Sequence, residues 1–144
     1  MYDIKIQSPF ERYPVAHPDC NSEKAMRLYQ EMDWVRIYRE IEETRSSPES
    51  PFYFFEINRK NQLGELETLC ISGFDSHSVG IGYMRPKMER RGFFVKKDVL
   101  NPQFATQMDS VEIPFALSCL EAFMKGDTNY LEENLHNRRV PLRL

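Results

Sequence analysis

The sequence is poor in cysteine, in long apolar runs and in net charge, and each shortage excludes a class of protein. Its three cysteines, Cys20, Cys70 and Cys119, are odd in number and widely spaced, whereas a secreted disulfide scaffold carries an even, denser set. No stretch approaches the roughly 18 apolar residues of a membrane span. The segment Met1–Phe10 lacks the basic start and apolar run of a signal peptide. We therefore expect a cytoplasmic protein without a membrane partner, with three free thiols.

The overall balance of residues is that of one ordinary globular domain. Hydrophobic residues make up 41% and charged residues 28% of the 144 positions, and this length is the commonest for a single domain. The net charge of −3 argues mildly against general affinity for nucleic acid, which usually requires a basic face. We predict a single domain over residues 1–144 that needs no cofactor.

Helical periodicity marks both ends of the chain. After the suitable N-caps Asn21 and Ser22, apolar residues recur at steps of three and four. This spacing predicts a long helix near 22–44, which the prolines and serines of 46–51 would end. The sequence leaves open whether this helix is broken near Asp33. Towards the C-terminus, Pro114 and Gly126 bracket a second helix near 114–125, and a capping box of Asn129 and Glu132 predicts a last helix over 130–136.

The centre of the chain has the period of strands. The runs 52–57, 66–72 and 79–84 are apolar or aromatic and are joined by short polar turns, which connect antiparallel neighbours. Residues 2–6 and 110–113 read as further short strands, and 93–95 as an optional one. Three prolines predict a loop over 9–18, and 97–107 carries only a weak pattern.

These elements predict an α+β fold. It is a mainly antiparallel sheet of four to six strands packed by the long N-terminal helix and a C-terminal helix. The predicted core consists of apolar residues on the inward faces of those elements: Ile4, Leu28, Met32, Ile37, Phe54, Ile57, Leu69, Ile71, Ile81, Leu117 and Leu120.

Few residues form a motif that indicates a catalytic or metal-binding site. Asp75 and His77 in a tight turn could act as an acid/base pair of a small enzyme, but the same residues are common turn formers. Cys70 and Cys119 lie in apolar surroundings and read as core residues rather than nucleophiles. His17 and Cys20 supply only one half of a zinc site, so we predict no bound metal.

Charges gather in two places. A basic segment over 85–97 holds six cations and is interrupted by Phe93 and Phe94, a pattern typical of either a solvated sheet edge or a nucleic-acid-binding module. Acidic residues cluster on the end of the long helix and around the central turns, Glu49 among them. An acidic face can steer a basic protein partner.

The segment Ser110–Asp127, with its strand, proline-led helix and glycine stop, resembles the C-terminal part of many immunity proteins of bacterial polymorphic toxin and contact-dependent growth inhibition systems. The hairpin over 66–84 is similar to the sheet hairpins of those small α+β proteins. The resemblance implies a non-catalytic cytosolic protein that binds and neutralises a cognate toxin domain.

If that toxin is a nuclease, acidic side chains would mimic phosphate in its basic cleft. On charge and position alone, we expect the partner to be contacted by six carboxylates: Glu40, Glu42, Glu43, Glu65, Glu67 and Asp75.

Overall fold

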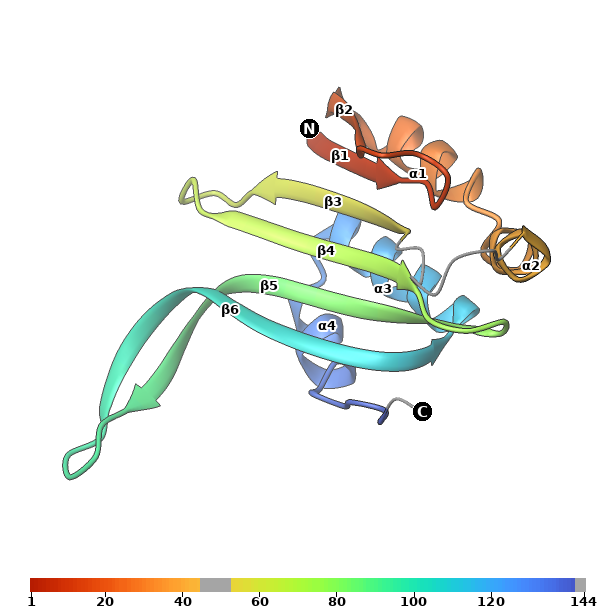
Figure 1. Cartoon of the computed structure of the whole chain (residues 1–144). Helices are drawn as coiled ribbons and strands as arrows, with labels where there is room; N and C mark the ends of the chain where they lie inside the picture. The colour runs from red at the N-terminus through yellow and green to blue at the C-terminus, as the bar shows by residue number, and fades with distance from the viewer. Residues whose placement is uncertain (45–52, 142–144) are drawn as a thin grey trace.

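A computed structural model describes residues 1–44 and 53–141 of the chain. In these ranges, six strands form one antiparallel sheet of order β2-β1-β3-β4-β5-β6, and four helices accompany it (Figure 1). The strands are β1 (Tyr2–Gln7), β2 (Val15–Cys20), β3 (Phe54–Lys60), β4 (Leu66–Gly73), β5 (Ser78–Arg91) and β6 (Lys97–Glu112). The helices are α1 (Ser22–Gln30), α2 (Trp34–Thr44), α3 (Ile113–Lys125) and α4 (Thr128–Asn134). The predicted α+β class with an antiparallel sheet is confirmed.

The long N-terminal helix predicted over 22–44 is two helices, which divide next to Asp33, where a break was left open. α1 ends at Gln30 and α2 begins at Trp34, and the Asp33 carboxylate accepts the backbone N–H of Arg36 at 3.2 Å. That bond caps a new helix start, because an aspartate before the first turn satisfies an unpaired N–H. The sequence beyond Thr44 that was predicted to end the helix, 46–51, lies outside the described residues, as do Glu49 and Phe52.

Two strands were missed or shortened by the sequence patterns. β2, a mostly exposed edge strand, begins inside the predicted loop 9–18 and continues to Cys20, and Pro18 is tolerated there because an edge strand can spare one N–H. β6 extends over 16 residues instead of the predicted four. Its first half is exposed on both sides, so it lacks the alternating burial from which strands are recognised.

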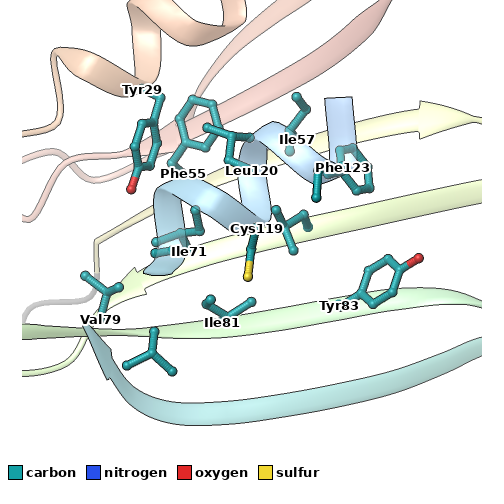
Figure 2. Close-up of a cluster of buried hydrophobic side chains, with 14 of the residues drawn as sticks. Tyr29, Phe55, Ile57, Ile71, Val79, Ile81, Tyr83, Cys119, Leu120 and Phe123 are labelled. Atoms are coloured by element: carbon teal, nitrogen blue, oxygen red, sulfur yellow. The ribbon is translucent and has the colours of Figure 1, made fainter. Parts of the chain in front are cut away.

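The core lies between the sheet and helices α1 and α3 (Figure 2). Phe55 and Ile57 of β3 and Ile71 of β4 point to the same layer as Leu120 and Phe123 of α3. Tyr29 of α1 closes one side of this layer, with its ring 5.2 Å from that of Phe55. Of the predicted core, six members are buried: Ile4, Ile57, Leu69, Ile71, Ile81 and Leu120.

The other predicted core residues are only partly buried. Leu28, Met32, Ile37 and Leu117 pack at the margin of the core. Phe54 was assigned to the wrong side of its strand, because its neighbours Tyr53 and Phe55 point inward and side chains alternate along a strand.

Helix α3 begins and ends as predicted. Pro114 occupies its first turn, and Gly126 ends it in the left-handed region at φ 73°, which glycine adopts at little cost. The capping box predicted at Asn129 is wrong. Asp127 caps α4, accepting the backbone N–H of Tyr130 at 3.1 Å, and Glu132 is directed to β5 instead.

The antiparallel order separates the turns into two groups (Figure 1). The β3–β4 turn lies at one end of the sheet, where β5 also runs out of it. The β1–β2 loop, the β4–β5 turn and α2 lie at the opposite end. We refer to these as the arm end and the far end.

Candidate protein-binding arm

The last part of the β5–β6 hairpin leaves the sheet. β4 pairs with β5 only as far as Thr68 opposite Met84, whereas β5 and β6 continue to pair with each other from Lys87 opposite Asn101 to Arg91 opposite Lys97. Figure 1 shows this part bending away from the body as a free ribbon. We call Lys87–Asn101 the arm. Every residue from Arg90 to Leu100 is exposed.

The tip of the arm is aromatic and in full contact with water. Phe93 and Phe94 are 97% and 96% exposed, Val95 is 70% exposed, and the two phenylalanine rings meet edge to face at 5.7 Å. Burying one such side chain is worth about 1.5–3 kcal/mol. The isolated fold gains none of this free energy from either ring. An exposed apolar cluster of this kind is typical of an interaction site.

Most charges of the arm are paired. Arg90 lies 3.5 Å from Asp98, Lys87 lies 2.9 Å from Glu132, and Arg91 contacts Glu89. Among the described residues, Lys96 and Lys97 beside the tip form no ion pair. The arm has five cations and two carboxylates, a net charge of +3; since the whole chain carries −3, the rest of the molecule carries −6.

The arm has two unlike faces, because directly opposed residues share a face of a hairpin. Met88 opposite Leu100 and Arg90 opposite Asp98 alternate on one face. Met88 and Leu100 are both about half exposed. This face therefore carries a second apolar pair, which the exposed Arg90–Asp98 ion pair separates from the tip.

The root of the arm is fixed to α4 by a buried arginine. The guanidinium of Arg85, 4% exposed, donates to both carboxylate oxygens of Glu132 at 2.8 and 2.9 Å and to Thr106 Oγ1 at 2.6 Å. It also stacks between the rings of Tyr83 and Phe104, 4.5 and 4.9 Å from their centroids. A two-pronged bond of this type fixes orientation as well as distance, so the first residues of the arm are held against the body.

Glu132 has a second cation, Lys87, on the same carboxylate. Hydrogen bonds from Arg85 and Lys87 lower the pKa of Glu132, more than offsetting the effect of its partial burial. The carboxylate is therefore ionised at neutral pH.

The six acidic residues expected to contact a partner do not form one surface. Glu40, Glu42 and Glu43 lie on α2 at the far end, together with the turn that holds Asp75, while Glu65 lies at the arm end (Figure 1). Glu67 is buried, and its carboxylate accepts from Arg59 Nε at 3.0 Å. Four of the six therefore lie at the far end, one lies at the arm end, and Glu67 is buried.

Asp75 and His77 lie in one turn, which the Asp75 carboxylate organises. One oxygen of Asp75 accepts the backbone N–H groups of His77 and Ser78 and the hydroxyl of Ser78, at 2.9, 2.8 and 2.8 Å. Partial burial raises the pKa of this carboxyl, but the three hydrogen bonds outweigh that effect and lower it. The His77 side chain is exposed.

The three cysteines are free thiols, as predicted. Burial raises the pKa of Cys70 and of Cys119 to about 12, so neither is a ready nucleophile at neutral pH. The Cys20 thiol donates to the carbonyl of His17 at 3.3 Å. No cluster of three or more metal-ligating side chains occurs in the part of the chain that is described.

Comparison with protein-family models, with curated proteins and with solved structures gives no match for this chain. Within residues 1–44 and 53–141, no helix is both long and apolar enough to cross a membrane.

The sequence reasoning noted the residues of the arm but not their arrangement. The signal was present: two adjacent phenylalanines follow Gly92 and have two cations on each side, at 90–91 and 96–97. That order places the aromatic pair at the turn of a hairpin, with Arg90, Arg91 and Lys97 on its strands and Lys96 directly before β6.

Proposed function

We propose that this protein is a non-catalytic cytosolic inhibitor of the immunity type, which binds a cognate toxin domain and neutralises it. The observation that carries the proposal is the arm: a projecting, apolar-tipped hairpin fixed at its root. The fold gains no core from residues 88–100, so the arm is explained by a partner that covers it.

The local structure of Ser110–Asp127 supports the immunity type in particular. The end of β6 leads directly into α3, with Pro114 in its first turn and Gly126 at its stop. This is the arrangement on which the resemblance to immunity proteins rests. Inhibition by occlusion requires a shaped surface and no reacting group.

The far end offers a second surface of opposite sign. Glu40, Glu42, Glu43 and Asp75 are presented there by α2 and the neighbouring turn. If the toxin is a nuclease, these carboxylates would face its basic cleft. An interface of about 1,600 Å² in total is the standard size for such a complex.

The test of the proposed function is genetic and biochemical. The proposal predicts that a toxin domain is encoded directly upstream of this gene. That domain is co-expressed with the protein, and cell survival and complex formation are measured. Protection together with a stable complex is expected. A toxin that kills cells despite abundant inhibitor would contradict the proposal.

An enzyme working through Asp75 and His77 is the alternative, and it predicts a different result. His77→Ala should leave protection within a few-fold, since the His77 side chain is exposed and the turn uses only its backbone N–H. A loss of several orders of magnitude in a folded variant would favour the enzyme.

A further inference from the structure

We propose that the arm is the anchor of the complex, and that its tip inserts into an apolar pocket with a carboxylate-lined rim on the partner protein. The proposal rests on the function proposed above and assigns the main contact to the arm end rather than to the acidic far end. It follows from three properties of the described residues.

The first property is the concentration of apolar surface at one point. Phe93 and Phe94 are almost completely exposed and lie on one turn, and aromatic side chains inserted into pockets dominate the affinity of most protein interfaces. Met88 and Leu100 form a second, half-exposed apolar pair on one face of the arm, beyond the Arg90–Asp98 ion pair. A groove in a protein covers both tip and face, whereas insertion of the tip into a lipid surface would leave that face in water.

The second property is the state of the arm's charges. Lys87, Arg90 and Arg91 are already paired with carboxylates of this chain. A strand of nucleic acid would require cations free to neutralise successive phosphates. Within the described residues only Lys96 and Lys97 lack an ion pair in the arm, and both adjoin the tip. Two lysines beside an aromatic pair complement carboxylates at the edge of a pocket.

The third property is preorganisation. The contacts of Arg85 with Glu132, Thr106, Tyr83 and Phe104 hold the root of the arm against the body. An anchor that is already positioned loses less conformational entropy on binding than a free loop.

The experiment uses calorimetry to measure binding of the full-length protein to the purified toxin domain that the proposed function predicts to be encoded directly upstream. The double variant Phe93→Ser/Phe94→Ser should bind about 100-fold more weakly, as loss of two anchor residues implies. The matched control is Phe10→Ser/Tyr13→Ser, which removes two exposed aromatics from the β1–β2 loop at the far end. The Kd of this control should stay within about twofold of the Kd of the unchanged protein. Urea unfolding of both variants checks that each is folded.

Charge reversal tests the rim. Lys96→Glu/Lys97→Glu should slow association about tenfold at low salt, with a smaller difference at high salt, because steering charges act on the association rate. An unchanged rate would contradict the carboxylate rim.

The outcomes separate the two proposals. If the unchanged protein binds the toxin domain and the phenylalanine variant binds equally well, the anchor is refuted and the inhibitor survives. If the unchanged protein does not bind the toxin domain, both fail. Binding dependent on Phe93 and Phe94 to phosphatidylglycerol vesicles, to single-stranded oligothymidine, or to a second copy seen by light scattering, without toxin binding, would likewise overturn the proposal in favour of that occupant.

Discussion

The two halves of the β5–β6 hairpin have the same backbone pairing and opposite surroundings. From Val79 to Arg85, the inward side chains of β5 are buried under α3 and against α4. From Lys87 to Arg91, the same strand is exposed for most of its length and pairs, among the described strands, with β6 alone. A two-stranded hairpin is marginally stable alone in water, so the arm depends on the body that it leaves.

The comparison separates two reasons for which an apolar residue is present in one continuous hairpin. Ile81 stabilises the fold, whereas Phe93 does nothing for it. Changes in the body half should therefore lower the free energy of unfolding, and changes in the arm should lower binding alone. Four changes test this division, beginning with the one expected to lower the free energy of unfolding most.

Ile81→Ala removes a fully buried side chain of the body half. We expect the free energy of unfolding to fall by about 2–5 kcal/mol. The paired change Met88→Ala, in the exposed half of the same strand, should cost less than about 0.5 kcal/mol. Urea unfolding followed by circular dichroism measures both. Equal losses would show that the arm is packed in solution.

Glu132→Gln removes the charge that holds Arg85 at the boundary between the halves. We expect a loss of about 1–3 kcal/mol, since hydrogen bonds between charged groups are among the stronger ones. The control is Glu133→Gln, an exposed neighbour, which should change stability by less than about 0.5 kcal/mol.

The loss of stability in Glu132→Gln should depend on pH, and the direction follows from the pKa of Glu132. The pKa of Glu132 is lower in the folded protein than the ordinary value for a glutamate. The stabilisation is therefore complete above the unfolded pKa and is lost as pH falls through the lower folded pKa. The difference between the protein and Glu132→Gln should shrink only at acid pH, and a difference that instead shrinks on the alkaline side would refute the assignment.

Asp75→Ala tests the turn that begins β5, as a contrast to the turn at the arm's tip. Three hydrogen bonds to one Asp75 oxygen are lost, and we expect a cost of about 1 kcal/mol. His77→Ala keeps the backbone donor and should be neutral. Thermal unfolding of the two variants side by side decides whether this turn is structural.

Replacement of Glu89–Val99 by Asn-Gly joins Met88 to Leu100 through a two-residue hairpin turn. The free energy of unfolding should stay within about 0.5 kcal/mol, because the removed side chains bury little. Protection against the toxin should be lost. A marked fall in the unfolding midpoint would mean that the arm contributes to the fold after all.

The parts of the fold that bury a regular stripe could be predicted from the sequence. Ile57, Leu69 and Ile81 lie in short apolar or aromatic runs bounded by polar turns, and Pro114 and Gly126 mark both ends of α3. The first half of β6 could not be recognised, because a strand exposed on both faces has no alternation. The division of 22–44 into two helices depends on one cap at Asp33, so the apolar period left a break there open without deciding it.

The candidate site was less accessible to sequence reasoning than the fold. Carboxylates such as Glu65 and Glu67 were chosen for their charge, but only the structure shows that Glu67 faces Arg59 inside the protein. Glu132 was interpreted as a local cap because Arg85 is 47 residues away in the chain. Contacts of that range follow from topology, which no spacing rule conveys.

The position of α3 in the chain has a consequence for synthesis. Strands β3, β4 and β5 are all complete before Ile113, the first residue of the helix that covers their apolar face. During translation, the side chains of Ile57, Ile71 and Ile81 therefore leave the ribosome well before their cover exists. A nascent chain stalled ahead of Ile113 would expose one apolar face of the sheet. Chaperones bind chains that expose apolar surface in this way.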